Sequence, residues 1–210
     1  YYNMNNYIEI IRTIPSFIFY YEINNKFNRY QSKKIALNSL SLCHASISTL
    51  LGFCIYLFKF NNNYIQINTG GYLIFDLYYM FMIGKYDLLR IMYIYHHITC
   101  YLYMLLPSIN FYWPQIVFFS ELSNIPNYLV YYSIKNDEKL NLGKNFRSNL
   151  TKNLLKVQLF YYAFFRIFVI GYYGILEISS ENYIPIEIYM TSILYIFGLI
   201  WFGFMLKQNL

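Results

Sequence analysis

Residues 91–120 read IMYIYHHITCYLYMLLPSINFYWPQIVFFS and contain no Asp, Glu, Lys or Arg. Two adjacent histidines, His96 and His97, lie inside this uncharged stretch. An ionisable side chain in a segment that crosses a bilayer is costly to place there, and it therefore marks a functional site by default. The stretch indicates both a membrane-embedded fold and the first place to look for function.

The rest of the chain is apolar in the same way. Of its 210 residues, 58% are hydrophobic and only 12% are charged, whereas a soluble domain carries about 25% charged residues. Most of its six apolar runs approach the ~20 residues that a helix needs to cross a bilayer. These runs are residues 35–58, 70–83, 91–107, 112–132, 154–176 and 184–206. The sequence therefore predicts an all-α, polytopic transmembrane helix bundle of about six to seven spans.

The net charge of +6 comes from lysines and arginines that cluster in every second connection. The basic connections are residues 26–34, 85–90 and 135–156, whereas residues 61–69 and 108–111 are uncharged and residues 177–187 are acidic. This alternation follows the positive-inside rule and places the basic connections on the cytoplasmic side. The cations are thus a signal of membrane topology, and we expect no nucleic-acid partner.

The chain divides at residue 34. Residues 8–23 form a weaker apolar run that Arg12 and Pro15 interrupt. We expect residues 1–34 to form either a partial first span or an interfacial segment, followed by a basic cytoplasmic connection. Residues 35–210 are expected to form one transmembrane domain.

Nine polar side chains stand out within the spans. They are His44, Asp76, His96, His97, Glu121, Ser123, Asn124, Asn127 and Arg166. Membrane-buried charges usually face the bundle interior and pair with one another, so we expect these groups to meet around a central, lipid-accessible cavity. Asp76 is expected to orient the histidine pair, and Arg166 to pair with Glu121. The alternative is structural, because such contacts also hold helices together, at ~0.6 kcal/mol each on average.

The chemistry of a buried histidine pair is limited by its geometry. Adjacent helical residues diverge by about 100°, so one metal ion would rarely accept both imidazoles, and we expect no metal site. The Gly70-Gly71 pair lacks the lysine and spacing of a phosphate loop. What remains is general-base or nucleophilic catalysis by imidazole, oriented by a carboxylate. The predicted catalytic residues are His96, His97, Asp76 and His44, with Glu121, Ser123, Asn124, Asn127 and Arg166 in support.

Five motifs in the same order resemble those of the TLC-domain family. They are SLCHA at 41–45, GYLIFDL at 71–77, HHIT at 96–99, ELSNIPN at 121–127 and FFRI at 164–167. The family includes ceramide synthases, translocon-associated proteins and small TLC-domain proteins of lipid homeostasis. The resemblance implies a helix bundle around a lipid-accessible cavity, in the endoplasmic reticulum or a related membrane.

The resemblance is closest to the small TLC-domain members. In the synthases a downstream pair of aspartates acts with the histidines, whereas residues 118–124 here read FFSELSN. Two hypotheses follow. The first is an acyltransferase-like enzyme, with membrane lipids and a long-chain acyl donor as partners, acyl-CoA as a substrate and no tightly bound cofactor. The second is a non-catalytic protein that binds lipid, regulates membrane composition or escorts cargo. A transporter is disfavoured because the chain lacks clear inverted repeats.

Overall fold

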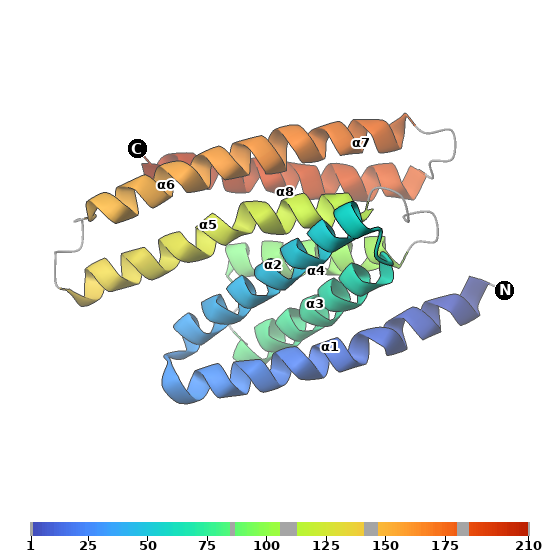
Figure 1. Ribbon diagram of the computed structural model, residues 1–210, viewed down its shortest axis with the longest axis horizontal. Helices are drawn as coiled ribbons and strands as arrows, with labels where there is room; N and C mark the ends of the chain where they lie inside the picture. The colour runs from blue at the N-terminus through green and yellow to red at the C-terminus, as the bar shows by residue number, and fades with distance from the viewer. Residues whose placement is uncertain (1, 85–86, 106–112, 141–146, 180–184, 210) are drawn as a thin grey trace.

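A computed structural model of the protein describes residues 2–84, 87–105, 113–140, 147–179 and 185–209 (Figure 1). The described part of the chain contains helices and short connections and no strand, which confirms the predicted all-α class. The helical elements are α1 (Tyr2–Tyr30), α2 (Lys33–Phe58), α3 (Asn63–Ile83), α4 (Leu88–Met104), α5 (Trp113–Lys139), α6 (Asn149–Tyr161), the π-helical segment η1 (Tyr162–Val169), α7 (Ile170–Ile178) and α8 (Pro185–Asn209). The segments α6, η1 and α7 follow one another without a break and form one rod.

The predicted apolar runs coincide with helices in the described residues, but two predicted connections do not. Residues 61–69 were expected to be a loop, whereas α3 already begins at Asn63. The reason is that the polar side chains of this segment find partners inside the bundle, as Asn68 does with Ser48 at 2.8 Å. Residues 135–156 were expected to be a connection, yet α5 continues to Lys139 and α6 already begins at Asn149.

Three helical segments of the described chain are long and apolar enough to cross a bilayer. They are Lys33–Phe58, Asn149–Leu176 and Pro185–Gln208. The helix α4 has 17 residues, and both α3 and α5 carry several polar residues that lower their hydropathy. The fold is therefore consistent with an integral membrane protein, and the count of six to seven spans stays a prediction.

Six helical rods form a closed ring, and α1 lies outside it (Figure 1). Around the ring, α2 packs on α3, α3 on α4, α4 on α8, α8 on the rod of α6 and η1, that rod on α5, and α5 again on α2. Helix α1 covers the outer side of α2 and α3. This arrangement encloses a central space between helices that are far apart in the sequence.

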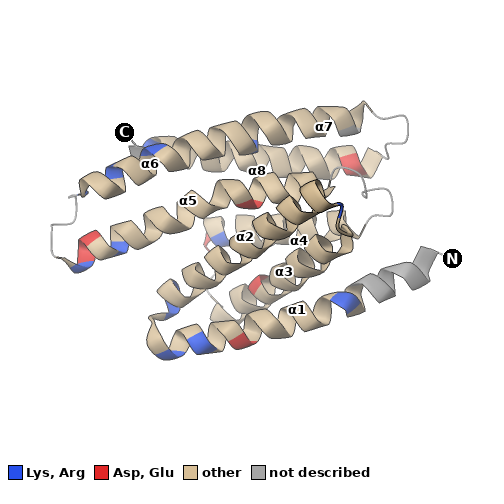
Figure 2. Ribbon diagram, viewed as in Figure 1, with Lys and Arg blue, Asp and Glu red and all other residues tan. Residues whose placement is uncertain are grey.

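Basic residues gather at one end of the bundle (Figure 2). That end joins the C-terminus of α1 to the start of α2, and the C-terminus of α5 to the start of α6; it also contains the C-terminus of α8. It carries Arg29, Lys33, Lys135, Lys139 and Lys207, among others. The alternation of basic connections along the sequence thus corresponds to one basic end in space, which we call the basic end.

Two glycines allow α1 to approach α3 closely. A Cβ atom added at Gly71 would lie 2.5 Å from Ser16 Oγ and 2.7 Å from the backbone nitrogen of Phe17. A Cβ atom added at Gly70 would lie 2.7 Å from Thr13 Cγ2. Small residues at a helix crossing are a common device for packing helices in membranes. The glycine pair therefore lies inside α3, where it allows the close packing of α1.

We expect Gly71→Ala to destabilise the fold by about 1–3 kcal/mol, the usual cost of overpacking. Gly203 in α8 is the matched control, because a Cβ atom there would meet no atom within 4 Å. Gly203→Ala should stabilise its helix by about 0.5–1 kcal/mol. Thermal unfolding in detergent measures both variants. Equal melting temperatures for the two variants would contradict the close α1–α3 contact.

A carboxylate links α5 to α6 at the basic end. Thr151 Oγ1 donates a hydrogen bond to Asp137 Oδ2 at 2.6 Å, and the backbone nitrogen of Ser148 donates to the same oxygen at 3.0 Å. Together these bonds hold the pKa of Asp137 below its ordinary value, and the bond from the Thr151 hydroxyl has the largest effect. Asp137 therefore contributes to stability above the unfolded-state pKa of 3.8, and this contribution is lost as the pH falls through the lower pKa of the folded state.

We expect Asp137→Asn to lower the melting temperature most at neutral pH. The difference from the wild type should shrink as the pH falls below about 4, because the wild-type carboxyl is then itself protonated. Glu138→Gln is the control, since Glu138 forms an exposed ion pair with Lys135, and such pairs contribute little. A difference that stays constant between neutral and acidic pH would refute the assigned role of the Asp137 charge.

Candidate functional site

A cavity of about 1090 Å³ occupies the centre of the helix ring. At the basic end its wall includes Leu88, which is 76% exposed, and the exposed residues Lys207 and Gln208. At the opposite end its wall includes Tyr103 and Trp113, which are 1% and 3% exposed. The cavity thus has a mouth at the basic end and a closed end opposite.

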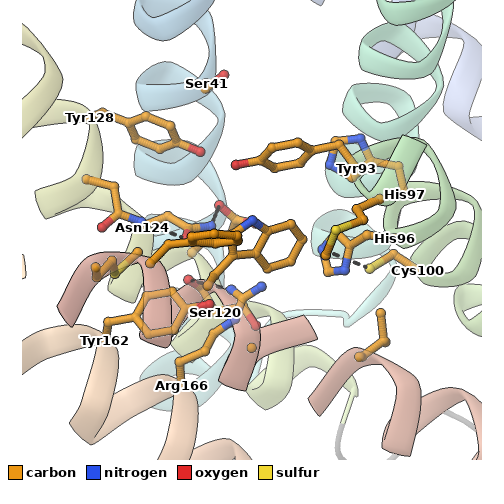
Figure 3. Close-up of a pocket in the computed structure, with 18 of the residues that line it drawn as sticks. Ser41, Tyr93, His96, His97, Cys100, Ser120, Asn124, Tyr128, Tyr162 and Arg166 are labelled. Atoms are coloured by element: carbon orange, nitrogen blue, oxygen red, sulfur yellow. Dashed lines mark hydrogen bonds between the residues drawn. The ribbon is translucent and has the colours of Figure 1, made fainter. Parts of the chain in front are cut away.

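Polar side chains line the cavity between its two ends (Figure 3). We call them the polar belt: His96, His97, Ser120, Glu121, Asn124 and Arg166. They come from α4, α5 and η1. Of the nine residues singled out from the sequence, six line the cavity: His96, His97, Glu121, Asn124, Asn127 and Arg166. His44, Asp76 and Ser123 do not line its wall.

His97 has a carboxylate directly behind it. Its Nδ1 lies 3.0 Å from Asp76 Oδ2, and Asp76 is 6% exposed. A carboxylate at this distance favours a proton on Nδ1, which leaves Nε2 as the basic nitrogen. The expected orienting role of Asp76 thus applies to His97 in particular.

His96 has a different environment, in which no carboxylate of the described chain forms an ion pair with it. Its Nε2 lies 3.7 Å from Cys100 Sγ, one turn further along α4. The ring packs edge-on against Trp201, with ring centroids 5.0 Å apart. Its Nδ1 is buried and has no hydrogen-bond partner among the described residues, although most buried polar atoms in proteins are paired.

His44 lies behind the cavity wall in a buried network. Its Nδ1 is 3.1 Å from the Tyr20 hydroxyl, which donates to Asn68 Oδ1 at 2.6 Å. Its ring stacks face to face on Tyr72, with centroids 3.8 Å apart and an angle of 4° between the planes. The network joins α1, α2 and α3, so the contacts of His44 are those of a structural or positioning residue.

Glu121 connects this network to the cavity. Its Oε1 lies 3.7 Å from His44 Nε2, and its Oε2 accepts a hydrogen bond from Asn124 Nδ2 at 3.3 Å. Asn127 Nδ2 in turn donates to Asn124 Oδ1 at 3.4 Å. The three polar residues of α5 therefore form a ladder along one face of the helix, and all three line the cavity.

The expected ion pair between Arg166 and Glu121 does not form. Arg166 Nη1 donates instead to the backbone carbonyl of Ser120 at 3.2 Å, and the guanidinium lies 5.7 Å from the centre of the Tyr162 ring. Glu121 is already contacted by His44 and Asn124. Ser123, which is fully buried, also donates to the Ser120 carbonyl, at 2.6 Å. Arg166 therefore places a cation on the cavity wall, and no carboxylate of the described residues forms an ion pair with it.

Sequence reasoning missed the tyrosines of the cavity wall. Tyr72, Tyr93, Tyr128 and Tyr162 all line the cavity, and Figure 3 shows Tyr93 and Tyr128 extending toward each other from α4 and α5. With 27 tyrosines in the chain, no single one stands out by type. The available signal was spacing, because each lies four residues from a polar residue already identified: Asp76, His97, Asn124 and Arg166, respectively. Residues four apart share a helix face.

These features define an all-helical protein, consistent with an integral membrane protein, with a polar belt inside a largely apolar cavity. No group of three His, Cys, Asp or Glu side chains in the described ranges is arranged to hold a metal ion. No family model, no curated protein and no solved structure matches the chain.

Proposed function

We propose that this chain is a multi-pass membrane protein of the TLC type that acts on a long-chain acyl group, most simply as an acyltransferase. The observation that carries this proposal is the His97–Asp76 pair, whose imidazole lines an enclosed, largely apolar cavity. A hydrocarbon chain gains ~0.8 kcal/mol per methylene on leaving water, so such a cavity is suited to an acyl chain. The five motifs in TLC-like order support the family assignment.

The ring of six rods, with α1 outside it, supports a bundle of six to seven spans. The basic end collects the connections that the positive-inside rule assigns to the cytoplasm. The mouth of the cavity then faces the cytoplasmic side, where a long-chain acyl-CoA would be available as the donor. The endoplasmic reticulum is the proposed membrane, on the strength of the family resemblance.

The proposed reaction uses His97 as a general base. The acceptor amine or hydroxyl attacks the carbonyl carbon of the thioester, and His97 Nε2 takes the proton of the acceptor. The new C–N or C–O bond forms as the C–S bond breaks, and the thiolate that leaves takes the proton from His97. Asp76 holds the ring and stabilises the imidazolium between these steps. Arg166 supplies a positive charge in the belt for the anionic oxygen or for a phosphate of the donor.

Mass spectrometry of lipids bound to the purified protein tests this proposal. We expect an acyl lipid to copurify, and we expect added acyl-CoA to transfer its acyl group to an amine, glycerol or lysophospholipid acceptor. Glu138→Gln is a suitable control variant because Glu138 lies in an exposed ion pair and does not line the cavity. A protein that carries no lipid and transfers no acyl group to any of these acceptors would refute the proposal.

A non-catalytic lipid-binding protein is the second candidate function. It is favoured by the sequence at 118–124, which lacks the aspartate pair of the synthases, and by the structural contacts of His44. In this case His97→Gln, which keeps a hydrogen-bonding side chain but loses basicity, should leave lipid binding and cellular function unchanged. Loss of cellular function at normal protein abundance would exclude this second candidate.

A further inference from the structure

The closed end of the cavity is sealed by packed apolar side chains. Tyr103, Trp113 and Val117 line the cavity there and belong to one hydrophobic cluster with Ile65, Met104 and Met190. Tyr103 and Trp113 meet edge to face with ring centroids 5.0 Å apart, and Tyr103 Oη accepts a hydrogen bond from Thr191 at 3.1 Å. We call Tyr103, Trp113 and Val117 the plug.

The distance from the polar belt to the plug follows from helix geometry. Leu88 and Tyr103 both line the cavity from α4, so the cavity extends over about 22 Å at 1.5 Å per residue. His96 and Tyr103 are separated by about 10 Å on the same scale. The belt thus divides the cavity into a half that leads to the mouth and a half that ends at the plug.

The two halves differ in what they can hold. The mouth half reaches the exposed side chains of Lys207 and Gln208, so a polar or charged headgroup there stays hydrated. The wall of the plug half is apolar around Val117 and Trp113, which are 4% and 3% exposed. A lipid that enters from the mouth therefore places its hydrocarbon end first into the plug half.

We propose that the plug limits the size of the acyl chain that this protein accepts, with Val117 as the residue that most directly sets the limit. This inference rests on the proposed function and names its substrate more closely: one long-chain acyl group of limited length, with its carbonyl at the polar belt and its methyl end against the plug. Because a straight segment of only about 10 Å fits between belt and plug, the end of a long chain bends in this half. The room beside Val117 then decides how many methylenes fit.

Val117 is suited to this role by its position. It lies one helical turn from Glu121 on α5, about 6 Å further from the mouth, on the same face as the polar ladder. Val117→Phe fills part of the plug half, and Val117→Ala enlarges it. Each methylene that is excluded should lower retention about fourfold, which corresponds to ~0.8 kcal/mol per buried methylene.

The experiment is a competition among saturated fatty acids of graded even length, mixed in equal amounts and incubated with the purified protein, with bound species measured by native mass spectrometry. We expect the wild type to retain a limited band of lengths. Val117→Phe should shift the band to shorter chains and Val117→Ala to longer ones. Ile134→Phe, at the mouth half of the cavity, is the matched control and should leave the band in place.

The outcomes separate the inference from the proposed function. If the wild type retains no fatty acid, the proposed function fails and the inference fails with it. If fatty acids bind but both Val117 variants keep the wild-type band, the inference is overturned and the proposed function stands. A variant that is merely damaged in folding loses all lengths together, whereas opposite shifts for Phe and Ala arise only from a change in room at the plug.

Discussion

Replacing His97 with Gln is expected to lower the rate of acyl transfer by about 10²- to 10⁴-fold, the usual contribution of a positioned general base. Glutamine keeps a hydrogen-bonding side chain on the cavity wall but cannot take a proton from the acceptor. The expected loss is therefore in turnover, while binding of the acyl chain is kept. Turnover is measured as single-turnover transfer from acyl-CoA, and binding as fatty-acid retention, so the two measurements distinguish a loss of catalysis from a loss of binding.

His96→Gln is the matched comparison, since both imidazoles line the cavity but only His97 has a carboxylate, Asp76, at 3.0 Å. We expect the smaller loss for His96→Gln. Asp76→Asn should lower transfer by at least tenfold, because an amide neither fixes the tautomer nor stabilises the imidazolium. Equal losses for the two histidine variants, with no effect of Asp76→Asn, would show that this pair is not the catalytic base.

Much of the fold could be predicted from the sequence, because hydropathy and helical length are local properties. The described residues of the apolar runs lie almost entirely in helices, and basic residues gather at one end of the bundle. The start of α3 could not be predicted in this way. Asn68 is an unfavourable residue for an apolar span by type, and only its contacts with Tyr20 and Ser48 make it acceptable in a buried helix.

Most residues of the candidate site could be predicted from the sequence, but which of them contact each other could not. Which residues share a cavity depends on how each helix is rotated about its axis, and the sequence of one helix does not specify its neighbours. Asp76 could be matched to the histidine pair, whereas the choice of His97 over His96 depends on the 100° between them. For the same reason the contact of Glu121 with His44, in place of Arg166, could not be foreseen.

The contact between His44 and Glu121 leads to the second large expected effect, which is on the stability of the fold. The Tyr20 hydroxyl has one proton, which it donates to Asn68. Its oxygen lies 3.1 Å from His44 Nδ1, and Asn68 Nδ2 lies 3.5 Å from the same nitrogen. His44 Nε2 then faces Glu121 Oε1 at 3.7 Å. His44 and Glu121 therefore form a buried contact between α2 and α5, and a double-mutant cycle measures its strength.

Removing one partner of a buried ion pair typically costs about 3–5 kcal/mol, because the other charge is left without compensation. We therefore expect His44→Phe, which keeps a ring to stack on Tyr72, to destabilise the protein strongly. Adding Glu121→Gln to that variant should restore part of the stability. An ordinary polar contact in a membrane contributes ~0.6 kcal/mol, so a double-mutant coupling well above that value identifies a buried ion pair between His44 and Glu121. Strictly additive effects on the free energy of unfolding would show that His44 and Glu121 act independently.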